Sequence, residues 1–166
     1  MTVLAEDDLK FDFSNALNAF SFDDDALHGN HTMKRVDFIA EYEDKWVFLE
    51  IKDPDNPAAA NPQALKQKLL SGNLIPDLAG KYRDSLWFRA LSSKLGSKPV
   101  HYIVLLSMAS LEPALLLTQQ DKLHKALPLT HTEWCMPFAS ACLILNLAQY
   151  QSKFGADSVR RISARE

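Results

Sequence analysis

The sequence of 166 residues is poor in cysteine and glycine and has no excess of positive charge. Its two cysteines, Cys135 and Cys142, form no CxxC pair, which argues against structural disulfides or zinc and predicts a reducing, cytoplasmic setting. The five glycines form no phosphate-binding loop, and the sequence holds no nucleophile elbow, internal repeat or low-complexity linker. The formal net charge is −3, so any surface that binds nucleic acid must be local.

Long apolar runs are also lacking. The most apolar region, residues 103–117, is interrupted by Glu112 and Pro113 and is too short to span a bilayer. The N-terminus has no charged segment followed by an apolar core, so we expect no signal peptide and no membrane association. With 47% apolar residues, the chain is predicted to fold as a single domain over residues 1–166.

Two apolar runs around a short polar turn carry most of the information. Residues 36–42 and 46–52 are rich in β-branched and aromatic side chains, and residues 43–45 between them are polar, which predicts a β-hairpin. A two-residue loop would place Asp37 directly opposite Glu50, with Cβ atoms roughly 5 Å apart. A loop longer or shorter by one residue would make the two carboxylates diagonal neighbours instead.

Two carboxylates at that distance repel each other unless a positive charge lies between them. A divalent cation, which prefers hard oxygen ligands, would supply that charge. Lys52 follows Glu50 by two residues and therefore shares its face of the strand. The hairpin thus predicts two acids and one lysine in a common space.

Asp37, followed by Glu50-Ile51-Lys52 at the end of an apolar strand, resembles the D…ExK core of the PD-(D/E)xK nuclease superfamily. Val36 stands where the proline of that motif would be. The resemblance implies a restriction-endonuclease-like α/β fold, a central mixed sheet flanked by helices in the order αβββαβ. It also implies that Asp37, Glu50 and the Ile51 carbonyl bind Mg²⁺, or Mn²⁺ in its place, and that Lys52 aligns the attacking water.

The implied activity is hydrolysis of phosphodiester bonds, and DNA is the expected substrate. The resemblance also suggests a role in defence against foreign DNA or in repair. The metal would polarise the scissile phosphate and lower the pKa of its bound water, while Lys52 stabilises the developing charge. Many small relatives need a second subunit or a protein partner. The apolar segment Leu115-Leu116-Leu117 would suit either a homodimer or such a partner, or else deep burial.

Two other interpretations remain open. The chain can be a catalytically inactive nuclease-fold module that binds nucleic acid or protein, since folds outlive their chemistry. Against this, Asp37, Glu50 and Lys52 are all present, whereas decayed copies usually lose one of them. The second is a purely structural hairpin with Glu50 and Lys52 facing solvent, which gives no reason for an opposed acidic pair.

Further candidates for contact with nucleic acid come from two predicted helices. The first helix, residues 61–71, presents Lys66 and Gln67, and some relatives place a Gln or Lys of this helix beside the active site. The second, residues 76–93, carries Lys81 and Arg83 beside an apolar stripe. These two cations can contact phosphate or form surface ion pairs, which are the more frequent case.

Four further acidic or histidine-containing sites are weaker candidates. Glu6 is a candidate for an additional acid from a helix before the hairpin, with a solvated acidic face as the alternative. Residues 23–25, all aspartate, predict a turn and helix cap, or a second metal ligand. His28 and His31 have the spacing of a metal pair on a helix, but Gly29 between them favours an ordinary polar loop. Asp53 is expected to cap the turn after the hairpin or to lie near the metal.

The remaining elements follow from periodicity and capping residues. They are a helix over 15–20 capped by Ser14, a buried strand over 100–108, a helix over 111–127, a strand over 141–145, a helix from Asn146 to Gly155, and a basic tail over 160–165 that is solvated or contacts phosphate. The family resemblance also implies a third strand in the meander, and we expect it within residues 20–22.

Overall fold

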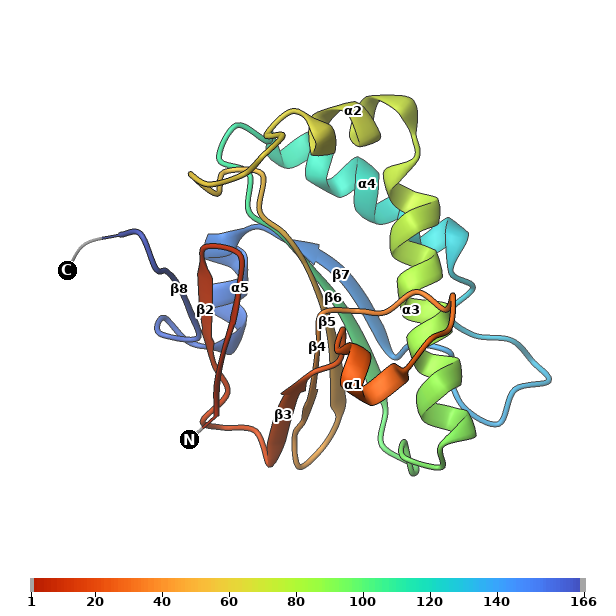
Figure 1. Cartoon of the computed structure of the whole chain (residues 1–166). Coiled ribbons are helices and arrows are strands. Elements are labelled where there is room, and N and C mark those ends of the chain that lie inside the picture. Colours follow the sequence, from red (N-terminus) through yellow and green to blue (C-terminus); the bar gives the residue numbers. More distant parts are fainter. Residues whose placement is uncertain (1, 165–166) are drawn as a thin grey trace.

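The computed structural model describes residues 2–164, and a five-stranded mixed sheet lies at its centre (Figure 1). In spatial order its strands are β3 (Asn18–Ser21), β4 (Phe38–Glu41), β5 (Trp46–Lys52), β6 (Val100–Leu106) and β7 (Ala141–Leu145). β3, β4 and β5 form an antiparallel meander, and β6 and β7 are added parallel to β5. The predicted α/β class is confirmed, and so is the third meander strand, which begins two residues earlier than expected.

The predicted hairpin register is confirmed. Phe38 pairs with Leu49 and Glu41 pairs with Trp46, so that the next position along the ladder sets Asp37 across from Glu50. The backbone N–H of Tyr42 donates to the carbonyl of Lys45 at 2.8 Å, which closes the loop around two exposed residues.

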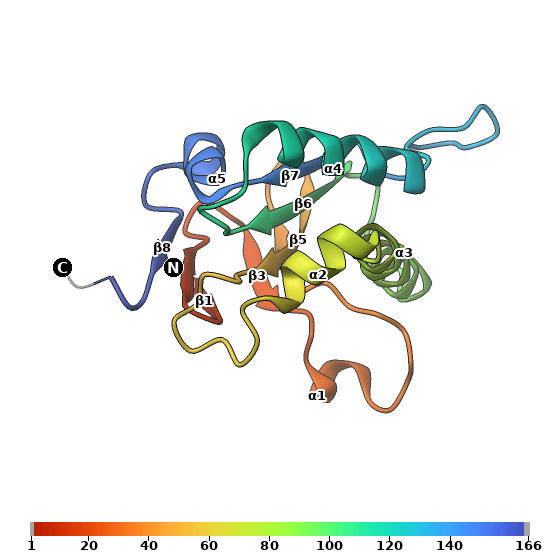
Figure 2. The same cartoon turned by 90° about the horizontal axis from the view of Figure 1, so that it is seen from above.

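A second, smaller sheet covers one face of the central sheet (Figures 1 and 2). It consists of β1 (Val3–Glu6), β2 (Leu9–Asp12) and β8 (Val159–Arg161), all antiparallel, and it packs beside α5 (Leu147–Phe154). Aromatic rings fill the space beneath it. Phe11 meets Phe38 of β4 edge-on at 5.5 Å between ring centroids and Tyr150 of α5 at 5.8 Å.

This small sheet stands where the αβββαβ order would put a leading helix, so that expectation is wrong: the described chain opens with a hairpin. The predicted helix over residues 15–20 is also wrong. The hydroxyl and N–H of Ser14 both donate to the side chain of Asp12, which makes a turn, and residues 18–21 then join β4 as a strand with Ala19 buried. Sheet hydrogen bonds and burial outweigh the weak helix signal of so short a segment.

Three helices cover the opposite face. They are α2 (Ala64–Ser71), α3 (Leu74–Leu91) and α4 (Pro113–Ala126). The predicted apolar stripe of α3 is confirmed at Leu78 and Tyr82, which are fully buried, while Leu86 is partly buried and Ala90 exposed. Within residues 2–164, no helix combines the length and apolarity needed to cross a bilayer.

Two C-terminal expectations have different outcomes. The predicted cap of α5 is confirmed, because the Asn146 side chain accepts from the Gln149 N–H at 2.8 Å and the Gln149 side chain accepts from the Asn146 N–H at 3.0 Å. In α4, Leu116 is buried, but Leu115 and Leu117 are 42% and 60% exposed, so deep burial of all three leucines is wrong. A homodimer or protein partner stays a prediction.

Candidate active site

Asp37 and Glu50 lie together on the face of the sheet that the helices cover. Asp37 directly precedes β4 and is 7% exposed, and Glu50 lies near the carboxyl end of β5 and is fully buried. The side chain of Asp37 is held in place because its Oδ2 accepts the backbone N–H of Ile51 at 2.6 Å. The structure therefore unites both predicted acids, and Ile51 contributes its backbone between them.

Lys52 is also where the motif predicts it. Its Nζ lies 2.6 Å from Oε1 of Glu50, and its side chain is 23% exposed, so the ammonium sits at the mouth of the buried pair. The other carboxylate oxygen of Glu50, Oε2, is buried and has no hydrogen-bond partner among the described residues. Buried polar atoms are rarely left without a hydrogen bond, so this oxygen is a candidate acceptor or ligand atom.

Lys81 completes the cluster from α3. Its Nζ lies 2.7 Å from Glu50 Oε1 and 3.7 Å from Asp37 Oδ1, and its side chain is only 18% exposed. One helical turn later, the buried Ser85 hydroxyl accepts the N–H of Val36 at 2.9 Å. That bond holds the segment before Asp37 against α3, the helix that carries Lys81. The surface ion pair predicted for Lys81 is wrong, because this pair with the acids is largely buried, and its contact with phosphate stays a prediction.

The other predicted contacts with nucleic acid lie on the surface. Lys66 and Gln67 are exposed on α2. Arg83 is 59% exposed and lies 3.6 Å from the adjacent Asp84, the ordinary surface ion pair. Lys68 of α2, which sequence reasoning overlooked, pairs with Asp77 of α3 at 3.2 Å. Asp77 also forms an ion pair with Lys34, whose Nζ lies 2.7 Å from Oδ1 of Asp77.

The electrostatics of the cluster follow from its burial. The pKa of Glu50 is raised to about 7, chiefly by burial and next by the nearby charge of Asp37, against the opposing charges of Lys52 and Lys81. Burial likewise raises the pKa of Asp37, although Lys81 and the Ile51 N–H oppose this. Burial alone would lower the pKa of Lys81, but Glu50 and Asp37 outweigh it and leave that pKa above its ordinary value.

Glu6 lies within electrostatic range of this cluster. Its pKa is raised to about 6, chiefly by burial and then by the charges of Asp37, Asp7 and Asp23, while the charge of Lys81 opposes the rise. The prediction placed Glu6 on a helix before the hairpin; it instead ends β1. Glu6 therefore stays a candidate for an additional acid of the site, but it is placed by a strand and not by a helix.

Asp53 has a partner that the sequence did not suggest. It follows Lys52 and is neutralised by Arg161 of β8, whose Nη2 lies 2.8 Å from Oδ1 and whose Nη1 lies 3.1 Å from Oδ2. Arg161 also contacts Asp8 at 3.2 Å and the Ser107 hydroxyl at 2.8 Å. Arg161 is thus a residue of β8 paired with two aspartates and not part of a freely solvated tail. The end of the predicted basic tail, Arg165, lies outside the described residues.

The remaining candidates form local contacts. The predicted capping role is confirmed for Asp24, whose side chain accepts the Ala26 N–H at 2.8 Å at the start of α1 (Asp25–His28). His28 is buried, its Nε2 lying 2.7 Å from the Phe22 carbonyl and its Nδ1 3.1 Å from Nε2 of His31. The two imidazoles therefore bond to each other and to the backbone. Cys142 is a buried core residue, as predicted.

The donor set can be tested for a divalent ion. Residues 2–164 hold no group of three or more His, Cys, Asp or Glu side chains arranged to bind a metal. Asp37 and Glu50 do offer a buried pair of hard oxygen donors, one of which, Glu50 Oε2, is unpartnered. Such a pair fits a Mg²⁺-like ion that completes its shell with backbone oxygen, water or phosphate.

Fold and site together define an α/β protein with two buried carboxylates and two lysines near the carboxyl end of a central strand. Comparison of the chain with protein-family models, curated proteins and solved structures finds no match. The functional argument therefore depends on the geometry of the site.

Proposed function

We propose that this chain is a metal-dependent nuclease of the PD-(D/E)xK type. It would use Asp37, Glu50 and Lys52 to hydrolyse phosphodiester bonds in DNA. One observation carries the proposal: the two acids face each other across the hairpin, with a bare carboxylate oxygen and a lysine at the mouth of the pair. A purely structural hairpin would have no need to bury two carboxylates at the same place.

The arrangement of strands supports a restriction-endonuclease-like core. An antiparallel meander, a helical crossover and a parallel strand follow one another as β3-β4-β5, α2 and α3, and β6. The chain departs from the proposed core at its start, where the small sheet covers the face expected for a leading helix. This departure leaves the acids untouched, because they face α3 on the other side.

Each residue has a role that its position supports. Asp37, oriented by the Ile51 N–H, and Glu50 would hold the ion, and the Ile51 carbonyl is the backbone ligand that we propose between them. When bound, Mg²⁺ would supply Lewis-acid activation of the phosphate and a water of lowered pKa. Lys52, partly exposed, can orient that water and stabilise charge on the phosphate with a compact ammonium.

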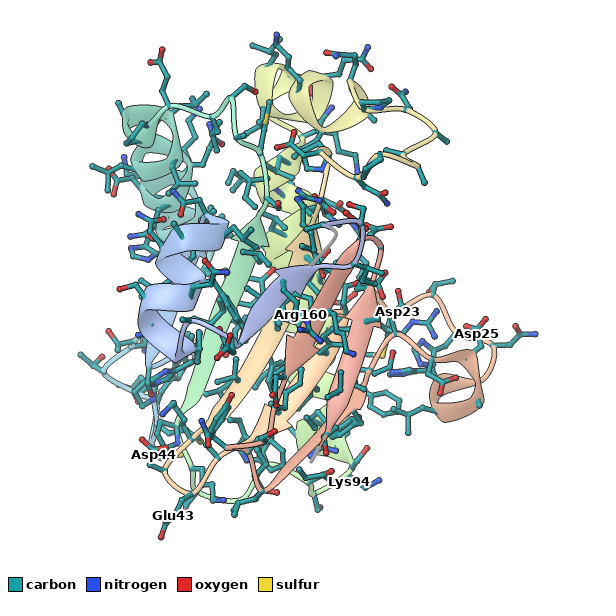
Figure 3. All side chains as sticks on the ribbon, turned by 90° about the vertical axis from the view of Figure 1, so that its left-hand side faces the viewer. Asp23, Asp25, Glu43, Asp44, Lys94 and Arg160 are labelled. Carbon is teal, nitrogen blue, oxygen red and sulfur yellow. The ribbon has the colours of Figure 1, made fainter. Side chains whose placement is uncertain are left out.

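The test compares cleavage of plasmid and single-stranded DNA with Mg²⁺, with Mn²⁺ and with chelator. Wild type should cleave with metal only, and Lys52→Ala should cleave about 10²–10³ times more slowly, because a group that stabilises transition-state charge is lost. Lys94→Ala is the matched control. Lys94 is exposed and lies at the same end of the molecule as Glu43 and Asp44 of the hairpin loop (Figure 3), whereas Glu50 is near the opposite end of β5.

Equal cleavage by wild type and Lys52→Ala would refute the mechanism. If no variant cleaves DNA or RNA, yet all retain DNA or a protein partner, the alternative function holds: a catalytically inactive module of the same fold. Melting curves for every variant ensure that loss of activity is not loss of fold.

A further inference from the structure

Lys81 reaches both carboxylates of the proposed site, whereas Lys52 is hydrogen-bonded to one. The Nζ of Lys81 lies 2.7 Å from Glu50 Oε1 and 3.7 Å from Asp37 Oδ1, and the Nζ of Lys52 lies 2.6 Å from Glu50 Oε1. A divalent ion shared by the two acids would need the same oxygens. Lys81 and such an ion are therefore competitors for one place.

The groups in contact are already balanced in charge, with two carboxylates against two ammoniums. The side chain of Glu50 is fully buried, and those of Asp37 and Lys81 are 9% and 18% exposed, so water screens their charges poorly. A divalent ion would add two positive charges to this neutral set. That excess is unfavourable unless an ammonium leaves or an anion enters. A phosphodiester is an anion and can also accept hydrogen bonds from a displaced lysine.

A second observation shows that the lysines do not fully satisfy the acids. Both ammoniums approach the same oxygen of Glu50, Oε1, and leave the buried Oε2 bare. Buried carboxylate oxygens are seldom left without a partner in native proteins, because desolvation without a hydrogen bond is costly. The arrangement therefore suits a state in which another cation takes part.

We infer that Lys81 keeps divalent ions out of the site until nucleic acid arrives, and then moves its ammonium from the carboxylates to a backbone phosphate. The inference rests on the proposed function and deepens it. Metal and nucleic acid would bind interdependently, and by linkage each must raise the affinity for the other by the same factor. Free protein would then hold little metal, and cleavage would be confined to the ternary complex.

The experiment measures Ca²⁺ and Mn²⁺ affinity by calorimetry, with and without a short DNA duplex, whose intactness is checked on a gel after each titration. The variants are Lys81→Met, which removes the charge but keeps most of the length, and Lys81→Arg, which keeps the charge. Lys94→Met is the control for loss of an exposed lysine. Wild type should bind metal at least tenfold more tightly when DNA is present. Without DNA, Lys81→Met should bind metal at least tenfold more tightly than wild type, Lys81→Arg and Lys94→Met.

Two results would overturn the inference. One is metal affinity in wild type that is the same with and without DNA, a measurement that needs no variant to fold. The other is a folded Lys81→Met that binds metal no better than wild type. Either result leaves the proposed function standing if wild type still cleaves DNA with Mg²⁺. Absence of both cleavage and metal binding, with DNA present, defeats the proposed function and the inference with it.

Discussion

Arg161 donates hydrogen bonds to both carboxylate oxygens of Asp53, at 2.8 and 3.1 Å. These bonds connect β8 to the residue that follows Lys52. The Asp53 side chain is fully buried, and that of Arg161 is 22% exposed. The bidentate pair therefore anchors β8 beside the carboxyl end of β5. Its loss would leave a buried carboxylate without its cation.

We therefore expect Arg161→Gln to lower the free energy of unfolding by about 3 kcal/mol, near the lower end for a broken buried pair, because Arg161 is partly exposed. The neighbouring Arg160 is exposed on β8 (Figure 3), and Arg160→Gln should stay within about 0.5 kcal/mol of wild type. Urea unfolding of the three proteins measures both values. Equal effects of the two substitutions would show that the pair with Asp53 is not the anchor.

Metal should stabilise the protein through Asp37 and Glu50. With a DNA oligonucleotide present, Mg²⁺ at ten times its dissociation constant should add about 1.4 kcal/mol, a rise in melting temperature of roughly 4 °C. Asp37→Asn and Glu50→Gln should abolish the rise, because each removes a ligand oxygen charge. Asp44→Asn, in the exposed hairpin loop, should keep it. A full rise in Asp37→Asn would place the metal elsewhere.

Acid should weaken the packing around His28. Burial lowers the pKa of this imidazole, and the charges of Arg35 and His31 lower it further against the Phe22 carbonyl and Asp23. The unfolded chain then binds more protons below its own pKa of about 6.5, so the stabilisation is complete above that pH and is lost as the pH falls.

Urea unfolding at pH 7.5, 6 and 5 tests this effect. His28→Gln, which cannot titrate, should lose less stability than wild type over this range. The control, His131→Gln, changes an exposed histidine and should follow the wild-type curve. Parallel curves for wild type and His28→Gln would contradict the assignment.

Glu6 should act in the opposite direction. Its pKa is raised to about 6 in the fold, from an ordinary value of 4.5, chiefly by burial and next by the charge of Asp37. The folded state thus holds the proton more tightly, and stability falls as the pH rises from about 4.5 through 6. Glu6→Gln should melt above wild type at pH 8, and the gap should close by pH 4.5. Glu43→Gln, an exposed loop variant, should show no such closing gap.

The hairpin and its acids could be predicted because the information is local. A two-residue loop fixes the register of both strands, and the register brings Asp37 to Glu50. Lys52 follows from the two-residue period of the strand. In the same way, the cap at Asn146 depends on residues within one turn of it.

The partners of these residues could not be predicted, because they come from distant parts of the chain. Periodicity places Lys81 off the apolar stripe of α3, but it does not say what that side of the helix faces. The contact depends on how α3 lies across the sheet, which the Ser85 hydroxyl and the Val36 N–H help to fix. One signal was available: two buried acids with only Lys52 beside them call for a further positive group.

The small sheet was missed for a similar reason. Leu9, Phe11 and Phe13 alternate with polar residues, which is the pattern of a half-buried strand. The pattern is short, however, and the second neighbour of that strand is β8, at the far end of the described chain. No local feature of either segment identifies the other.

The pairing of β2 with β8 also sets an order of events during synthesis. Asp8 and Arg161, which contact each other beside these strands, are 153 positions apart, so the free edge of β2 must wait while almost all of the described chain leaves the ribosome. Until then, the aromatic layer around Phe11 lacks its cover and the edge is open to other chains. The five-stranded sheet has no such delay, because each of its strands pairs with the one before it. A nascent chain interrupted before Val159 would therefore carry the proposed site nearly complete while the aromatic layer around Phe11 still lacked part of its cover, which makes aggregation a hazard over that interval.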